Sequence, residues 1–340
     1  MQAASGQLDV LARSQPISAV VEDPATAPDT RARLVLVREV RGFAVHELDL
    51  PDGRSFRSYA DLGRAYAVWN VVAAPEFSIE PRRWCFPVAG CVAYRGYFDQ
   101  DAARRQARKL ASRGDDVSLG GVATYSTLGH LPDPVFNTML GWRESRLVGT
   151  IFHELAHERL YVTDDSEFNE AFASVVEAEG IRRWYAARDQ AAELATWERQ
   201  EAREREFAAL LRDARARLER LYASGLSPAE MRVEKQRELG RLKFAYAGLR
   251  AGWDGFAGYD GWFDRLLNNA HLAAVATYHD CVPGLARELE AAGSLPAFYE
   301  RMTALARMSR AERHAAVCGK GDIPYFVDPI ANEPWRAGSK

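Results

Sequence analysis

The spacing of apolar residues divides this chain into a helical start, a β-rich middle and a long helical remainder. In residues 1–50, apolar side chains recur at the three- and four-residue intervals of an amphipathic helix, as at Leu34, Val37 and Val40. Prolines interrupt this pattern and predict two helices, with Asp29 or Thr30 as the N-cap of the second.

Residues 55–130 differ, because short apolar runs are bounded there by proline and glycine. Tyr66–Val72 and Gly90–Tyr94 are rich in aromatic and β-branched residues and predict strands. A short helix is expected over Asp101–Ser112, followed by an extended segment over Val117–Tyr125. Together these elements predict a small mixed β-sheet.

From about residue 143 the pattern is helical. Residues 181–224 are crowded with arginine, glutamate and alanine, and leucines recur among them at helical spacing. After a break, Ser227 and Pro228 suit an N-cap and a first helical turn. We therefore expect a long antiparallel helical hairpin over residues 181–252, with a solvated charged face at which a protein partner could bind.

One short motif in the helical part carries chemistry. His153-Glu154-Leu155-Ala156-His157 has the form H-E-x-x-H. Residues four apart lie on one face of a helix, so the two imidazoles can bind one Zn²⁺ ion. The glutamate beside the first histidine can accept a proton from water on the metal, which makes Glu154 the candidate general base.

A zinc site needs a third protein ligand, and the segment 168–177 offers one. Glu170, Ser174 and Glu177 follow at i, i+4 and i+7 and so share one helix face. Glu170 is the expected third ligand, while Ser174 and Glu177 are candidates for orienting a histidine or the ligand carboxylate. Glu177 can equally lie on a solvated face.

H-E-x-x-H followed by the Asn169-Glu170-Ala171 helix resembles the gluzincin metallopeptidases, the group of thermolysin and the zinc aminopeptidases. A larger part of the chain, from about residue 7 to about residue 285, resembles a bacterial family of predicted aminopeptidases. The stretches that carry this second resemblance are Tyr59–Leu62, Trp69–Ser78, Trp84–Cys91, Tyr94–Phe98, Tyr125–Gly129 and Leu267–Ala270.

The spacing departs from the thermolysin-like pattern at the third ligand. Only twelve residues separate His157 from Glu170, fewer than in that group, and Glu177 stands at the more familiar distance. The context of Glu170 favours it as the ligand, but the choice between the two glutamates stays open.

The resemblance implies a zincin-like core, in which a donor beyond the metal stabilises the charge on the peptide oxygen. Gluzincins often take this donor from the region after the zinc helices, where Tyr278 is preferred here and His271 is an alternative. Zincins also hold an extended substrate along the edge strand of a sheet. We assign that role to Gly120-Gly121-Val122-Ala123-Thr124-Tyr125, which could equally be an ordinary hairpin strand.

The four cysteines bear on the cellular compartment. Cys85 and Cys91 flank a Pro/Gly turn that could bring them together, and we predict a disulfide between them. Cys281 and Cys318 could form a second pair, although their positions do not favour it. Members of the resembled family are exported, which implies a periplasmic or outer-membrane-anchored protein. No signal sequence is visible at residues 1–6, so any lipid anchor lies outside this chain.

Composition fits an enzyme and narrows the partners. With 340 residues, 47% of them hydrophobic and 27% charged, the chain can bury a large core. A net charge of −3 gives no reason to expect nucleic acid as a partner. No apolar run approaches membrane-spanning length.

We therefore expect an α+β, mostly α-helical fold. Its parts are N-terminal helices in 1–50, a zincin-like catalytic core in 51–180, the hairpin in 181–252, and C-terminal helices with an irregular tail in 253–340. The expected function is zinc-dependent hydrolysis of peptides, as an aminopeptidase by resemblance. The familiar G-x-M-E-N motif of aminopeptidases is absent, so an endopeptidase also fits. A zinc-containing, non-catalytic binding or chaperone-like protein is the alternative from another class.

Overall fold

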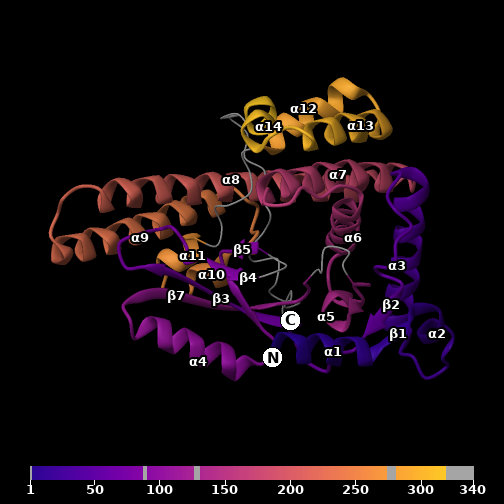
Figure 1. Ribbon diagram of the computed structural model, residues 1–340, viewed down its shortest axis with the longest axis horizontal. Coiled ribbons are helices and arrows are strands. Elements are labelled where there is room, and N and C mark those ends of the chain that lie inside the picture. Colours follow the sequence, from indigo (N-terminus) through magenta and orange to yellow (C-terminus); the bar gives the residue numbers. More distant parts are fainter. Residues whose placement is uncertain (1, 87–89, 126–130, 274–280, 319–340) are drawn as a thin grey trace.

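The computed structural model describes residues 2–86, 90–125, 131–273 and 281–318 (Figure 1). This part of the chain is mostly helical and carries three small β-sheets, which agrees with the expected α+β class. Among its helices, none combines the length and the apolar character needed to span a membrane.

The N-terminal region contains three helices instead of the two expected. α1 (Gln2–Arg13), α2 (Ile17–Glu22) and α3 (Pro28–Glu47) accompany the short strand β1 (Ser14–Pro16). The expected N-caps, Asp29 and Thr30, are wrong, because α3 begins at Pro28 and has Ala27 at the N-cap position. The fixed φ angle of proline suits a first helical turn, so the helix starts earlier than the polar residues suggest. The apolar stripe is buried as predicted.

The β-structure forms three small sheets where the sequence predicted one, and one of the three is mixed. In the first sheet, β1 pairs antiparallel with β2 (Ser58–Ala60). β2 in turn pairs parallel with β8 (Val135–Phe136), which makes this the mixed sheet of the molecule.

The second sheet is antiparallel, and we call it the central sheet. β3 (Val68–Pro75) pairs with β6 (Arg95–Tyr97) on one side and β7 (Asp115–Val122) on the other. The third sheet is the hairpin of β4 (Trp84–Phe86) and β5 (Gly90–Val92). The predicted strand Gly90–Tyr94 is therefore interrupted after Val92, where the chain leaves one sheet for the next.

Strand β3 is buried on both faces because a helix covers each. Trp69, Val71 and Ala73 pack with side chains of α4 (Gln100–Ala111), the helix expected at Asp101–Ser112. Val72 and Ala74 point the other way and meet α11 (Asn269–Ala273). Alternate residues of a strand face opposite sides, so a nearly continuous apolar run is what a doubly covered strand requires.

The helical hairpin consists of α8 (Ala191–Tyr222) and α9 (Pro228–Ala251), which extend to the left in Figure 1. The predicted start of α9 is confirmed: Ser227 caps the helix through a reciprocal pair of hydrogen bonds with Glu230. The hairpin begins at residue 191 and not at 181, because the preceding helix continues to Ala186. Its inner face packs around an aromatic cluster that includes α10 (Asp260–Phe263).

Buried polar contacts attach the hairpin to the central sheet. The Asn269 side-chain amide donates to the carbonyls of Pro75 and Glu76, at 3.2 and 2.9 Å, and its carbonyl accepts from Tyr222 of α8 at 2.8 Å. Lys235 of α9 pairs with Asp116 of β7 at 2.5 Å. Because these groups are shielded from water, the hairpin is held in one orientation relative to the sheet.

Three C-terminal helices, α12 (Val282–Ala292), α13 (Leu295–Ala306) and α14 (Arg310–Val317), lie at the top of Figure 1, and their apolar side chains join those of α7 in the main core. A disulfide between Cys281 and Cys318 joins the start of α12 to the end of α14.

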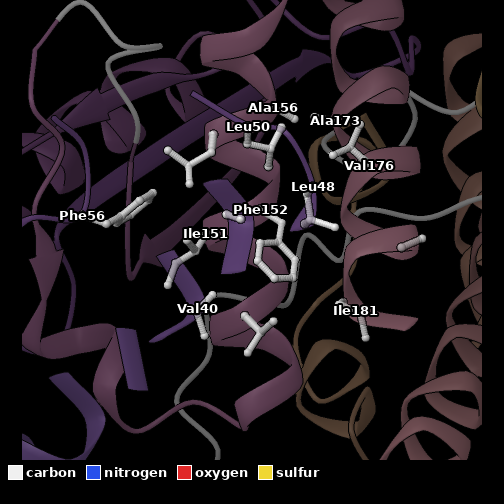
Figure 2. Close-up of a cluster of buried hydrophobic side chains, with 14 of the residues drawn as sticks. Val40, Leu48, Leu50, Phe56, Ile151, Phe152, Ala156, Ala173, Val176 and Ile181 are labelled. Atoms are coloured by element: carbon white, nitrogen blue, oxygen red, sulfur yellow. The ribbon is translucent and has the colours of Figure 1, made fainter. Parts of the chain in front are cut away.

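The helices that carry the H-E-x-x-H motif and the glutamates pack against each other through the main apolar core. α6 (Glu144–Arg159) follows the single turn α5 (Asn137–Leu140), and α7 (Ser166–Ala186) comes directly after α6. Figure 2 shows side chains of α6, α7 and α3 in this core, among them Phe152, Val176 and Val40. An added Cβ at Gly180 of α7 would lie 2.6 Å from the Phe152 ring, so this glycine lets the two helices approach closely.

Candidate metal centre

Local contacts fix the short connection between α6 and α7. Asp165 is the N-cap of α7 and accepts a hydrogen bond from the Phe168 backbone N–H at 3.4 Å. The Asn169 side chain, almost fully buried, bonds both the N–H and the carbonyl of Val162, each at 2.8 Å. The loop is therefore held by Asp165 and by Asn169, and Glu170 comes directly after Asn169 in the sequence.

The two histidines and Glu170 converge on one point between the helices. Nε2 of His153 lies 3.2 Å from Nε2 of His157 and 3.3 Å from Oε2 of Glu170. Oε1 of Glu170 is 3.7 Å from His157 Nε2. The potential ligand atoms of His153, His157 and Glu170 all lie within 4.8 Å of one another. We call these three residues the metal cluster.

Glu177 contacts the far side of the first histidine. Its Oε2 lies 3.0 Å from Nδ1 of His153, whereas Glu170 faces Nε2. Gly149 on α6 leaves room for this carboxylate, because an added Cβ there would come within 2.5 Å of Glu177 Oε1. The geometry thus gives the two glutamates different positions: Glu170 at the converging nitrogens and Glu177 behind one ring, where it can orient the imidazole.

Burial and the two carboxylates act in opposite directions on the histidines. Burial lowers the pKa of His153, but hydrogen bonds to Glu170 and Glu177 raise it, and the result lies well above the ordinary value of 6.5. Burial and the neighbouring His153 together lower the pKa of His157 to about 4. Without a cation, one imidazolium is therefore stabilised between the carboxylates while the other ring stays neutral.

Two tyrosines that the sequence analysis missed lie beside the metal cluster. The ring centroid of Tyr161 is 6.2 Å from that of His157, with the planes at 74°. Burial, followed by the nearby charges of Glu170, Glu154 and Tyr161, raises the pKa of Tyr94, which lies between β5 and β6. Both side chains are partly exposed, Tyr94 at 43% and Tyr161 at 44%. Tyr161 stands four residues after His157, a spacing that could have drawn attention to it. Tyr94 stands in one of the stretches that carry the family resemblance, but nothing in that stretch indicated a role for it.

Of the other expected site residues, His271 and Ser174 are among those that the structure describes. Tyr278 lies outside the described residues. His271 is in α11, where its Nδ1 is 2.8 Å from the Asn268 side-chain carbonyl and its ring packs on Trp262. Ser174 is buried on α7, and no hydrogen bond between it and either histidine is found in the described part of the chain. Its orienting role stays a prediction.

The expected substrate strand is only partly a strand. β7 ends at Val122, so Ala123, Thr124 and Tyr125 lie beyond it, and Ala123 is buried. Among the described strands, β7 is an edge of its sheet. Near the start of β7, the Val117 carbonyl already accepts a hydrogen bond from the Asn268 side-chain amide at 3.0 Å. Substrate pairing with Gly120–Val122 stays a prediction.

Both cysteine pairs are disulfide-bonded. The bond between Cys85 and Cys91 agrees with the prediction and links directly opposed residues of β4 and β5. The bond between Cys281 and Cys318, which the sequence did not favour, forms because folding brings α12 and α14 together. His314 lies near this second pair, but the sulfurs are bonded to each other and are not thiolate ligands.

Comparisons with known proteins agree with the sequence resemblance at the level of the family. A family model described as "Putative aminopeptidase" matches residues 1–317. Searches of curated proteins and of solved structures find no match. The zincin-like core and the gluzincin class therefore stay predictions. The match spans nearly the whole chain, including both helices of the metal cluster, and this protein belongs to the family described as "Putative aminopeptidase".

Proposed function

We propose that this protein is a zinc-dependent metallopeptidase that acts as an aminopeptidase. In this proposal His153, His157 and Glu170 hold the ion, and Glu154 is the general base. The observation that carries it is the convergence of two imidazole Nε2 atoms and one carboxylate between α6 and α7. The family description supports peptidase activity.

The donor set fits a divalent cation such as Zn²⁺. With Nδ1 of His153 facing Glu177, the neutral ring donates there and keeps its lone pair on Nε2. That lone pair faces a second imidazole nitrogen and a carboxylate oxygen, at 3.2 and 3.3 Å. Electron-rich atoms at these distances repel unless a proton or a cation lies among them. Two histidines and one glutamate are a common ligand set of catalytic zinc.

Each residue of the site has its own role in the proposed hydrolysis. When bound, Zn²⁺ lowers the pKa of coordinated water toward about 7 and polarises a carbonyl. Glu154, half-buried on α6, accepts the proton that water loses as its oxygen bonds to the peptide carbon. The same carboxyl then gives the proton to the amide nitrogen as the C–N bond breaks. The products are a carboxylic acid and an amine, and Glu154 ends as it began.

We also propose that the protein works outside the cytoplasm, in the periplasm or anchored at the outer membrane. Its two disulfides support this, since such bonds persist in oxidising compartments and are rare in cytosolic proteins. The substrate class is a peptide or protein.

Metal analysis combined with turnover tests the proposal. The chain is purified with its disulfides intact, metal content is measured by plasma mass spectrometry, and hydrolysis of aminoacyl amides and of a peptide library is followed. We expect about one zinc per chain, loss of hydrolysis with a chelator, and recovery on adding zinc.

The positions of the cuts decide the subclass. Release of single N-terminal residues supports an aminopeptidase, whereas internal cuts indicate an endopeptidase. A folded protein that binds no divalent ion contradicts the metal site. Zinc without hydrolysis of any library member favours the non-catalytic binding protein.

A further inference from the structure

The C-terminal helices carry a second group of side chains with metal-binding chemistry. The potential ligand atoms of Cys281, His314 and Cys318 all lie within 4.8 Å of one another. Cys281 is the N-cap of α12, His314 lies in α14, and Cys318 directly follows that helix. We call these three residues the Cys–His cluster. Its two sulfurs are joined in a disulfide, so they are not ligands in this oxidised form.

His314 makes the contact that usually supports a metal-ligating histidine. Its Nε2 lies 2.8 Å from Oδ1 of Asp165, a fully buried carboxylate that Arg313 also holds at 2.5 Å. In the neutral ring, Nε2–H donates to this oxygen and the lone pair stays on Nδ1. Histidines that bind metals almost always donate their other N–H to such an acceptor. Asp165 therefore fixes both the orientation of the ring and its tautomer.

The charges around the Cys–His cluster allow a cation to bind. The charge of Arg313 is already compensated by Asp165. Glu167 adds a negative charge, because its Oε2 lies 3.7 Å from Nδ1 of His314. The other nearby cation is Arg310, which lies 3.8 Å from the same carboxylate and is 61% exposed, so water screens its charge.

Reduction turns the two sulfurs into potential ligands. A phosphine reductant gives two electrons to the S–S bond and takes an oxygen from water, which leaves two thiols and a phosphine oxide. Zn²⁺ then displaces the two thiol protons as it binds the thiolates. Two cysteines and one histidine are a known zinc ligand set, with water at the fourth position. Cys318 and His314 are partly exposed, so the reductant and the ion can reach the cluster.

The spacing of the ligand atoms suits one ion. Zinc binds sulfur at about 2.3 Å and nitrogen at about 2.0 Å, so the donors around a tetrahedral ion stand roughly 3.5–4 Å apart. The ring nitrogen already lies within 4.8 Å of both sulfurs. Once the S–S bond is broken, small side-chain movements bring the three donors to these distances.

We propose that the Cys–His cluster is a second zinc site, which forms when the Cys281–Cys318 disulfide is reduced. The ion then joins the start of α12 to the end of α14, as the disulfide does in the oxidised protein. The two helices are therefore linked in both redox states, and His314 stays beside Asp165. The inference does not depend on the proposed peptidase function, because it uses no residue of the metal cluster.

Cobalt and zinc binding by the reduced protein test the proposal. The whole chain is reduced with a phosphine, freed from the reductant without oxygen, and titrated with Co²⁺. Thiolate ligands give cobalt a charge-transfer absorption that the nitrogen and oxygen ligands of the metal cluster cannot give. We expect this absorption in the reduced protein and not in the oxidised one, and we expect added zinc to abolish it. Plasma mass spectrometry should show that reduction raises the zinc content by about one ion per chain.

Paired cysteine variants assign the sulfur ligands. Replacing Cys281 and Cys318 with serine should abolish the cobalt absorption and the additional zinc. Replacing Cys85 and Cys91 with serine is the matched control, because it removes the other disulfide. This control should bind zinc after reduction as the wild type does.

A histidine variant assigns the nitrogen ligand. His314→Gln keeps a hydrogen-bond donor for Asp165 but lacks the imidazole, so it should weaken zinc binding by the reduced protein more than about 10-fold. His46→Gln, at an exposed position of α3, is the control and should bind zinc as the wild type does.

Several outcomes would overturn the proposal. It is wrong if reduction adds no zinc, if the Cys281/Cys318 variant keeps the cobalt absorption, or if the Cys85/Cys91 variant loses it. Thermal unfolding of the Cys85/Cys91 variant covers the case in which reduction alone loosens the fold. Zinc should raise its melting temperature more after reduction than before, and a reduced chain that stays unfolded with zinc would contradict the site.

Discussion

Helix α7 carries two polar clusters, and they differ in how their charges are paired. At its N-terminus, fully buried Asp165 meets Arg313 at 2.5 and 2.7 Å and His314 at 2.8 Å, both from α14. We call these three residues the Asp165 cluster. Little more than one turn further along α7, the metal cluster brings two imidazoles together with Glu170, and Glu177 and Glu154 add further acid nearby.

The two clusters differ in how many of their charges and hydrogen-bonding groups find partners within the protein. The Arg313 guanidinium, 3% exposed, also donates to the Met308 carbonyl at 3.0 Å and lies over the Phe168 ring. Its charge is thus paired and its N–H groups are used, as a buried ion pair requires. The metal cluster, taken together with Glu177 and Glu154 beside it, has more carboxylates than cations, and its ligand atoms have lone pairs that face each other. The Asp165 cluster is satisfied within the protein, whereas the metal cluster fits the cation that we propose for it.

The largest expected effect is on chemistry and comes from Glu154→Gln. Because only the proton acceptor is lost, kcat should fall by about 10²–10⁴, while zinc content and the free energy of unfolding stay near wild type. Steady-state kinetics and metal analysis on the same preparation measure this. Loss of zinc along with activity would show that Glu154 contributes to the site in another way.

Asp165→Asn should affect the fold instead. Removing one partner of a buried ion pair costs about 3–5 kcal/mol, and chemical denaturation measures the loss. The control is Glu177→Gln at the metal cluster, which removes a charge from an acid-rich site and should change the stability of the metal-free protein by less than about 1 kcal/mol. Similar losses in both variants would remove the distinction between the clusters.

The stability lost in Asp165→Asn should depend on pH. Hydrogen bonds from His314 and Arg313 outweigh burial and hold the pKa of Asp165 below its ordinary value of 3.8. A lowered folded-state pKa contributes stability above the unfolded pKa, about 3.9, and this contribution is lost as pH falls through the folded-state value. The gap in stability between wild type and Asp165→Asn should therefore narrow below about pH 4. A constant gap across that range would argue against the pairing.

Replacing Glu170 of the metal cluster and replacing Glu177 beside it should reduce the zinc affinity of the protein by different amounts. Glu177→Ala removes a group that orients His153 and should weaken zinc binding about 10–100-fold. Glu170→Ala removes a proposed ligand and should weaken it more. Competition with a chromophoric chelator measures both constants. If Glu177→Ala has the larger effect, Glu177 is the ligand and the assignment of Glu170 is wrong.

The smallest expected effect is that of Gly149→Ala. The new methyl group would meet the end of the flexible Glu177 side chain and displace its carboxylate from His153, so zinc affinity should fall, but by less than in Glu177→Ala. Gly42→Ala in α3 is the matched control, because no atom lies within 4 Å of its added Cβ. It should leave zinc binding unchanged and stabilise the helix by about 0.5–1 kcal/mol. Equal zinc affinities in the two variants would contradict the positioning of Glu177.

Features that depend on neighbours in the sequence were predictable. The pairing of His153 with His157 follows from the helical repeat, and Ser227 caps α9 through a contact within one turn. The break between α8 and α9 and the burial of Val37 on α3 follow from the sequence pattern, although the start of the hairpin at residue 191 does not. The disulfide of Cys85 with Cys91 was predictable because its loop is short.

Tertiary structure decided which groups meet when they are distant in the chain. Glu170 and Glu177 share a helix face, so only the docking of α7 on α6 determined that one contacts Nε2 of His153 and the other Nδ1. Arg313 meets Asp165 from a helix about 150 residues away in the sequence. Periodicity along a sequence specifies the faces of helices and strands, but the pairing of these faces depends on packing the whole core at once.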